Sequence, residues 1–373
     1  MDKIGINASP RVKKLRERML TTPEICIERG YLLTESYKET ENYPAIIRKA
    51  KALAKILKEM TIRIEDGELI VGTVSSKPRA GALTPELNST WYLKEMEVLS
   101  TRDWDKFSPL TEEDKEKMKA FLPYWKGKSL TDKWYGLVPK EAQRLTNKIQ
   151  SGGAFCVNNQ YYGHISVAYE KVLSNGLNGI RKQVDEELAG LNIAKPADLD
   201  KFHFLTAINI TLDAAAAFAK RYADLATMLA DKTADMQRKA ELREIAEICE
   251  WVPANPARNF HEALQSIWFT YVVLMIEGWG TGIGFLRTDQ YLYPFYKRDI
   301  ESGRITKEEA RELLALLYIK MNGGVIPYPT EVVKVFGGFS LAANITLGGL
   351  TKDGKNAVNE LSYLFLDAEK DVG

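Results

Sequence analysis

The segment Phe260–Ile276 is apolar nearly all round when it is drawn as a helix, and no other stretch constrains the fold as much. Such a helix cannot lie on a surface, because whichever side faced water would expose apolar area. The pattern therefore predicts a central helix that other elements cover on every side. It also predicts a large core, since several packed elements are needed to bury one helix completely.

Helical periodicity continues over much of the chain. Thr111 and Thr306 each begin a sequence typical of a helix N-terminus, and the second helix should run through Met321. Thr22-Pro23 also favours a helix start, because a hydroxyl N-cap precedes proline at the first helical position. Further helices are expected at Val12–Met19, Ala45–Met60, Ser166–Leu173, Ile180–Leu188, Leu212–Trp251 and Ala357–Glu369.

Short strands should interrupt these helices. The segment from Ile62 to Val74 favours a hairpin that turns at Asp66-Gly67, and Ala343–Leu347 favours a strand. Phe285–Pro294 is aromatic and ends in proline, so we expect no helix there. Because no repeat, low-complexity tract or linker divides the chain, residues 1–373 should form one continuous, helix-rich domain.

The composition excludes several classes of function. The chain carries 51 Lys+Arg against 50 Asp+Glu, and a net charge of +1 offers no basic field to a nucleic acid. Its 3 cysteines are scattered without metal-ligand spacing, which predicts no metal site and a reducing, cytoplasmic environment. No uninterrupted apolar run reaches about 18 residues, so we expect no membrane span and no signal peptide.

The glycines of Gly280-Thr281-Gly282-Ile283-Gly284 follow an apolar run, as in dinucleotide-binding loops. The spacing is G-x-G-x-G rather than G-x-G-x-x-G, and the preceding run is long for a strand. These departures disfavour a nucleotide site.

Several polar residues have both a structural and a functional interpretation. His164 lies in a loop rich in Gly, Asn and aromatic residues, where it either bonds the backbone at a helix start or serves a site. Cys156 in the same loop has no base nearby in the sequence and suits a small buried side chain as well as a nucleophile. Glu277 is expected to pair with a cation such as Arg287. The residues expected to be structural are Cys26, Cys249, His203 and His261.

Several stretches occur in a recognisable order along the whole chain. They are Glu65–Gly72 with Lys77–Arg79, Gly163–Ile165 with Tyr169–Leu173, Asn259–Gln265, Ile276-Glu277 with Arg287–Pro294, and Asn344 with Leu347–Gly349. Together they resemble the glycyl radical enzymes of the pyruvate formate-lyase-like superfamily, in particular its glycerol dehydratase and decarboxylase branch. An ordered series of matches is more specific than any single motif.

The resemblance implies an α/β fold, namely the helix-rich N-terminal half of the family's ten-stranded β/α barrel. Residues 1–373 would then be the N-terminal portion of a pyruvate formate-lyase-like domain, truncated before the catalytic cysteine loop. In the family that cysteine lies in a Gly-Cys-Val-Glu loop, and the radical glycine lies near the C-terminus. This sequence contains neither motif. We therefore expect the chain alone to be inactive.

The implied activity is that of a glycyl radical lyase, of the formate C-acetyltransferase or glycerol dehydratase kind. Such an enzyme cleaves a C–O, C–C or C–N bond of a small organic substrate in anaerobic metabolism. The resemblance implies no cofactor on this chain, because a radical-SAM activase would install the glycyl radical on the C-terminal part. The implied partners are the substrate, this activase, the C-terminal half and, when complete, a second copy in a homodimer.

The resemblance also assigns candidate site residues. His164 matches a ligand and acid for a substrate hydroxyl, and Cys156 matches a pocket wall. Thr281 and Gly282 stand where the glycerol dehydratase type has His and Ser, and Phe339 stands where it has Tyr. Fewer hydrogen-bonding groups imply a pocket less suited to glycerol. Without the family, Thr281 and Gly282 are also consistent with plain loop structure and Phe339 with an apolar wall.

A second class of function remains open from the sequence. The same half-fold is compatible with a non-catalytic relic or with a regulatory protein that binds a partner. The gene sequence beyond Gly373 distinguishes the two classes, because only the enzyme needs the cysteine and glycine loops.

Overall fold

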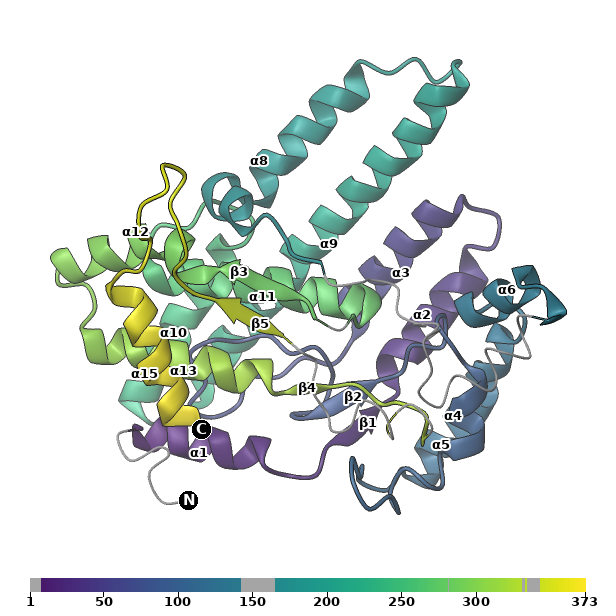
Figure 1. Cartoon of the computed structure of the whole chain (residues 1–373), viewed down its shortest axis with the longest axis horizontal. Coiled ribbons are helices and arrows are strands. Elements are labelled where there is room, and N and C mark those ends of the chain that lie inside the picture. Colours follow the sequence, from purple (N-terminus) through teal and green to yellow (C-terminus); the bar gives the residue numbers. More distant parts are fainter. Residues whose placement is uncertain (1–7, 142–164, 281, 331–332, 334–342) are drawn as a thin grey trace.

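The computed structural model of the chain describes residues 8–141, 165–280, 282–330, 333 and 343–373. Figure 1 follows the chain through these elements, with the helices on the outside of two small sheets. The helices are α1 (Pro10–Met19), α2 (Glu28–Glu39), α3 (Ala45–Glu59), α4 (Thr90–Glu95), α5 (Glu112–Phe121), the 3-10 turn η1 (Leu122–Trp125), α6 (Leu130–Leu137), α8 (Tyr169–Ala189), α9 (Pro196–Lys232), α10 (Met236–Trp251), α11 (Phe260–Gly278), α12 (Thr288–Glu301), α13 (Lys307–Met321) and α15 (Glu360–Val372).

Helix α11 is the centre of the main core, as its all-round apolar sequence predicts. Its side chains Phe260, Leu264, Ile267 and Phe269 are fully buried. The helix contacts α3, α8, α9, α10, α12 and α13, so neighbours cover it from several directions. Its N-cap Asn259 accepts a hydrogen bond from the Glu262 amide, which satisfies one amide of the first turn.

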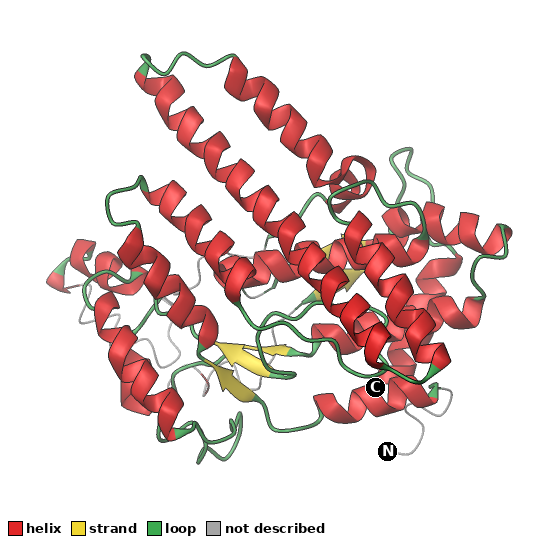
Figure 2. Ribbon diagram, turned by 180° about the vertical axis from the view of Figure 1, so that it is seen from behind, coloured by secondary structure: helices red, strands yellow, loops and turns green. Residues whose placement is uncertain are grey.

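The strands form two parallel sheets (Figure 2). One contains β1 (Glu24–Cys26), β2 (Ala80–Ala82) and β4 (Gly324–Val325), and the other contains β3 (Gly284–Arg287) and β5 (Asn344–Thr346). Each pairing is parallel, so helices must carry the chain back between strands. Parallel strands with helical crossovers confirm the predicted α/β class.

Most of the predicted helices are present. The Thr306 capping box is complete, since its hydroxyl accepts from the Glu309 amide and the Glu309 carboxylate accepts from the Thr306 amide. Thr111 caps α5 by accepting from Asp114. The two short helices expected after Ser166 are one helix, α8, which is kinked at Gly176. The long periodic segment ending at Trp251 is two helices, α9 and α10, and α9 begins earlier than predicted.

Two predictions about the first hundred residues were wrong. Thr22-Pro23 precedes strand β1 rather than a helix, because Glu24–Cys26 pairs with Ala80–Ala82. Cys26, which was expected to be structural, is therefore buried within a strand. The hairpin predicted between Ile62 and Val74 is also absent from the described structure, which has no strand in that segment.

A side chain takes the place of the partner strand in the expected hairpin. Gln265 on α11 accepts a hydrogen bond from the Val71 amide at 2.9 Å and donates to the Val71 carbonyl at 2.7 Å. This buried amide therefore pairs with the backbone as a neighbouring strand would. The segment packs against the central helix and stays irregular.

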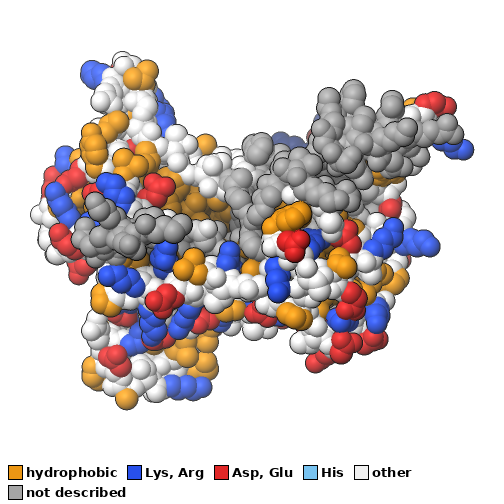
Figure 3. All heavy atoms as spheres, turned by 60° about the horizontal axis from the view of Figure 1, so that its bottom comes forward, with side chains coloured by type: hydrophobic (Ala, Val, Ile, Leu, Met, Phe, Trp, Pro, Cys, Tyr) orange, Lys and Arg blue, Asp and Glu red, His pale blue; other side chains and the backbone are white. Residues whose placement is uncertain are grey.

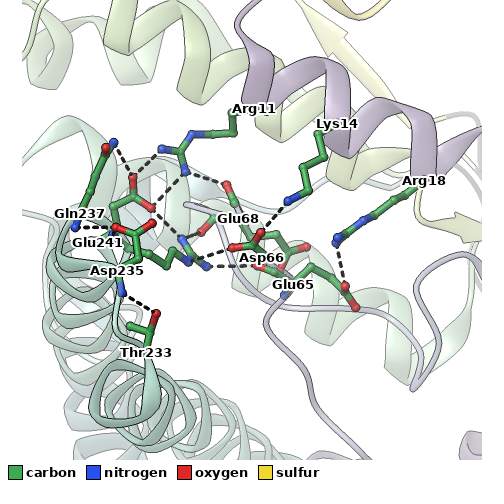
Figure 4. Close-up of polar contacts among 12 residues, drawn as sticks. Arg11, Lys14, Arg18, Glu65, Asp66, Glu68, Thr233, Asp235, Gln237 and Glu241 are labelled. Carbon is green, nitrogen blue, oxygen red and sulfur yellow. Dashed lines mark hydrogen bonds and ion pairs between the residues drawn. The ribbon is translucent and has the colours of Figure 1, made fainter.

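A layer of charged residues joins the turn at Glu65–Glu68 to α1 and α10 (Figure 4). Arg238 is largely buried and donates to the carbonyls of Glu68 at 2.9 Å and Glu65 at 3.1 Å. Arg11 forms an ion pair with Glu241, and Arg18 forms one with Glu65 at 2.8 Å. The stretch Glu65–Gly72, one of those that resemble the family, therefore holds α1 against α10.

Phe285–Pro294 differs from its prediction as well. Thr288–Glu301 is helix α12, with Pro294 inside it. Proline in a helix interior removes one backbone hydrogen bond. Packing of Tyr291, Leu292 and Tyr296 into the core outweighs that loss, since all three side chains are buried.

Helix α9 is long and apolar enough to cross a membrane by length and composition, with a mean hydropathy of 1.3 in the best window and 28% of that window buried. The sequence prediction considered only uninterrupted apolar runs and so did not single it out. In the structure α9 packs along α3, α8 and α10.

Candidate active site

Three segments that are far apart in the sequence meet at the start of strand β3. Gly284 pairs with Asn344 at the start of β5, and an isolated parallel bridge joins it to Ser166 before α8. The Gly284 amide donates to the Ile165 carbonyl at 3.4 Å. A Cβ on Gly284 would lie 3.3 Å from the Ser166 hydroxyl, so only glycine fits without displacing a neighbour. We call the meeting point of Ser166, Gly284 and Asn344 the strand edge.

The strand edge adjoins the predicted site residues in the sequence. Gly282 is buried and has a φ of +69°, a conformation that favours glycine. It lies two residues before Gly284. The other predicted site residues, His164, Cys156, Thr281 and Phe339, lie outside the described residues.

Arg29 of α2 holds the start of the loop that leads to the strand edge. Its side chain is 2% exposed and donates to the carbonyls of Ile276 at 2.6 Å and Glu277 at 2.9 Å, the last turn of α11. It also donates to the Leu83 carbonyl after β2 at 3.0 Å. The carboxylate of Glu86, 4% exposed, accepts from the guanidinium at 2.6 Å. The buried guanidinium of Arg29 therefore links the end of α11 to the segment that follows β2.

Trp279 holds the same loop from its other side. It caps α11 in the left-handed conformation, with φ 47° and ψ 48°, which costs a residue with a Cβ about 1–2 kcal/mol. Its indole N–H donates to the Val325 carbonyl of β4 at 3.1 Å. The surrounding contacts therefore maintain a turn that glycine would adopt without strain.

A stack of aromatic rings supports the strand edge. Phe285 lies between Tyr169 and Tyr271, with ring centroids 5.6 Å and 4.8 Å away and nearly parallel planes. Tyr291 donates its hydroxyl to the Phe285 carbonyl at 2.7 Å. Burial raises the pKa of Tyr169 and of Tyr271, so both phenols stay neutral at neutral pH. Within the described part of the chain, neither of these two hydroxyls has a hydrogen-bond partner.

Glu277 pairs with Lys49 at 3.1 Å and not with Arg287, as the sequence had suggested. Arg287 instead donates to the carbonyl of Leu350, because the two strands bring these residues together. Glu277 and Lys49 both line a groove of about 480 Å³ whose other lining residues, from α3, α8, α9 and α11 and nearby loops, are almost all apolar. Among the described residues that line this groove, the two charged side chains thus pair with each other.

Metal binding has no support in the described ranges, where no group of three or more His, Cys, Asp or Glu side chains could hold an ion. Cys249 is buried, and burial raises the pKa of its thiol, which keeps it unreactive. His261 donates a hydrogen bond from Nε2 to the Leu69 carbonyl, 2.9 Å away, in the structural role expected of it. On the face drawn in Figure 3, basic and acidic side chains are intermingled, which agrees with the lack of a basic field.

Arg29, Glu86 and Trp279 were missed by sequence reasoning. The available signal was an arginine on the apolar face of a helix, in line with Leu32 and Leu33 of α2. An unpaired charge does not persist in such a position, so it indicates a buried partner. The sequence alone does not say which carboxylate supplies that partner.

The parallel strands and helical crossovers define an α/β protein, and its candidate site lies at the strand edge, where β3 and β5 begin. The family model described as pyruvate formate lyase-like matches residues 6–372. The chain therefore belongs to the pyruvate formate lyase-like family, and its relatives are glycyl radical enzymes.

Curated relatives align over nearly the whole chain. The isethionate sulfite-lyase of Nitratidesulfovibrio vulgaris is 39% identical over 94% of this chain and 44% of its own length. The trans-4-hydroxy-L-proline dehydratase of Clostridioides difficile is 32% identical over 96% of this chain and 45% of its own length. The chain thus spans less than half the length of these relatives.

Solved structures agree with the fold. A structure described for 1,2-propanediol dehydration in Roseburia inulinivorans superposes with a TM-score of 0.94 and 37% identity, over 100% of this chain and 44% of that one. The glycerol-bound B12-independent glycerol dehydratase from Clostridium butyricum gives 0.92 and 37%, over 98% of this chain and 46% of that one. Helix α9 is therefore part of the family fold. The predicted partial barrel of a glycyl radical enzyme is confirmed.

Proposed function

We propose that this chain is the N-terminal portion of a glycyl radical lyase or dehydratase. The observation that carries the proposal is the match to the family over residues 6–372 together with relatives whose names are lyases and dehydratases. These names concern C–S and C–O cleavage, and we propose radical cleavage of a C–O, C–C, C–N or C–S bond in a small organic substrate. We take all of residues 1–373 as one continuous part of the catalytic domain.

The residues of this chain would form one side of the site. Arg29, Trp279 and the aromatic stack fix the strand edge. A glycyl radical, which we propose a radical-SAM activase installs on the C-terminal part, would supply hydrogen-atom abstraction. His164 would donate a hydrogen bond to a substrate hydroxyl or carboxylate and protonate a leaving group.

Cys156, Thr281, Gly282 and Phe339 would shape the substrate pocket. They offer fewer polar groups than the His, Ser and Tyr of the glycerol dehydratase type. A hydrogen-bonding substrate loses much affinity when its partners are absent. We therefore propose a substrate less dependent on several hydroxyl contacts than glycerol.

We propose that the complete protein is a cytoplasmic homodimer that works in anaerobic metabolism. Its partners would be the activase and the C-terminal half, with neither nucleic acid nor membrane. The alternative of a non-catalytic relic or regulatory protein gains no support from the relatives named above, which are all enzymes.

Two experiments test this function. The gene is read beyond Gly373 for a Gly-Cys-Val-Glu loop and a radical-glycine loop, and their absence would favour the relic. The protein, as its gene encodes it, is then activated anaerobically and offered isethionate, 1,2-propanediol, glycerol and trans-4-hydroxy-L-proline. Turnover of one of them, with little activity on glycerol, is expected. Glycerol as the best substrate would contradict the proposed pocket.

A further inference from the structure

We infer that Arg29 is a positioning residue for the substrate site, because it sets the path of the loop from Gly278 to Gly284. The inference rests on the proposed function in one respect, namely that Gly282 in this loop belongs to the substrate pocket. Arg29 lies on α2, far from the loop in sequence, and nothing in the family resemblance assigned it a role.

The contacts of Arg29 differ from those of an ordinary ion pair. Besides the Glu86 carboxylate, it donates to the carbonyls of Ile276 and Glu277, which belong to the last turn of α11. Carbonyls of a last turn have no partner within the helix and carry its negative end. A buried guanidinium satisfies two of them at once and so defines where α11 ends.

The point at which α11 ends determines how the next residues leave the helix. Trp279 turns the chain in a left-handed conformation, and its indole is held by Val325. The direction in which the chain leaves α11 at Gly280 depends on this turn, which is strained and needs support from both sides. Arg29 supplies the support from the α2 and β2 side, and Trp279 supplies it from the β4 side.

Lysine cannot replace arginine here. Its ammonium group is a compact charge without the planar fork that reaches carbonyls of Ile276 and Leu83 as well as Glu86. Arg29→Lys therefore keeps the charge and loses part of the positioning. By contrast, Arg29→Met with Glu86→Leu removes both charges, so that no buried charge is left unpaired, and it also removes the donor to the Ile276, Glu277 and Leu83 carbonyls.

Arg238 is the matched control. It is 9% exposed, donates to the carbonyls of Glu65 and Glu68, and pairs with Glu241 at 2.9 Å. Its chemistry is that of Arg29, but it anchors the turn at Glu65–Glu68 and not the loop after α11.

The test is hydrogen exchange of peptides that cover 276–287, measured by mass spectrometry in the protein as its gene encodes it. Arg29→Lys should speed exchange there about tenfold or more, the factor for one lost hydrogen bond, and Arg238→Lys should leave it unchanged. The Arg29→Met/Glu86→Leu variant leaves no unpaired buried charge and should still exchange fast in this segment. Normal protection in that double variant, or faster exchange spread evenly over the chain, would overturn the inference.

Activity separates this inference from the proposed function. On a turned-over substrate, Arg29→Lys should change KM and kcat unequally at unchanged radical content, whereas Arg238→Lys should change neither. Should the wild type form no glycyl radical, the proposed function fails, but the exchange experiment still decides the role of Arg29.

Discussion

His164 is the candidate site residue whose chemistry is most specific. A histidine with a pKa near ~6.5 can donate a hydrogen bond at neutral pH and then protonate a departing hydroxyl. We predict that His164→Ala lowers turnover by about 10²–10⁴. The glycyl radical, measured by EPR, should form to the same extent. Unchanged turnover would return His164 to a structural role at a helix start.

Gly282 combines a predicted site role with a constrained backbone. Because its φ is +69°, Gly282→Ser should lower the free energy of unfolding by about 1–2 kcal/mol. Gly303 has a φ of +67° and open space around it, so Gly303→Ser controls for the backbone alone. Denaturant unfolding should show similar losses, whereas only Gly282→Ser should alter turnover. An undiminished stability of Gly282→Ser would contradict this account of the turn.

Tyr222 gives a pH dependence whose sign is defined. Burial raises its pKa from 10.0 to about 12, so its neutral form stabilises the fold fully below pH 10 and this contribution is lost as the pH rises through about 12. Its hydroxyl accepts from the buried Thr73 amide at 3.1 Å. Tyr222→Phe should therefore cost about 1–3 kcal/mol at pH 8.

Between pH 10 and 12 the difference in unfolding free energy between wild type and Tyr222→Phe should shrink, because only the wild type loses stability by ionising this phenol. Chemical denaturation across this range measures the difference. A gap that is constant with pH would show that Tyr222 does not titrate as described.

At the scale of elements, most helices were predictable, whereas among the strands only β5 was, since Asn344–Thr346 lies within the predicted strand Ala343–Leu347. The Thr306 box and the apolar face of α11 are local signals, readable within one turn or a few. Strands β1 and β2 are each three residues long and pair across more than fifty residues, so nothing local identifies them. The false hairpin before Val74 has the same cause, because its partner is the Gln265 side chain on a distant helix.

The complete capping box of α13 offers a quantitative test of such local signals. Thr306→Ala removes the acceptor for the Glu309 amide and should lower stability by about 0.5–2 kcal/mol. Thr306→Ser keeps the hydroxyl and serves as the control, with a loss near zero. Thermal unfolding of both variants measures the effect. Equal losses would mean that the hydroxyl does not cap this helix.

At the scale of the whole molecule, an ordered series of motifs in the sequence predicted the family and the partial barrel. The sequence did not predict the contacts that hold the candidate site in place. Gly282 could be singled out because the family resemblance places it where the glycerol dehydratase type has Ser. Arg29, Glu86 and Trp279 act through contacts between α2, α11 and β4, and such contacts exist only in the folded chain.

The central claim is the proposal that residues 1–373 form the N-terminal portion of a glycyl radical enzyme. The most direct measurement is EPR after anaerobic incubation with an activase, S-adenosylmethionine and a reductant. The protein as its gene encodes it should give a glycyl doublet, and residues 1–373 alone should give none. A doublet from residues 1–373 alone, or none from the gene's full product, would contradict the claim.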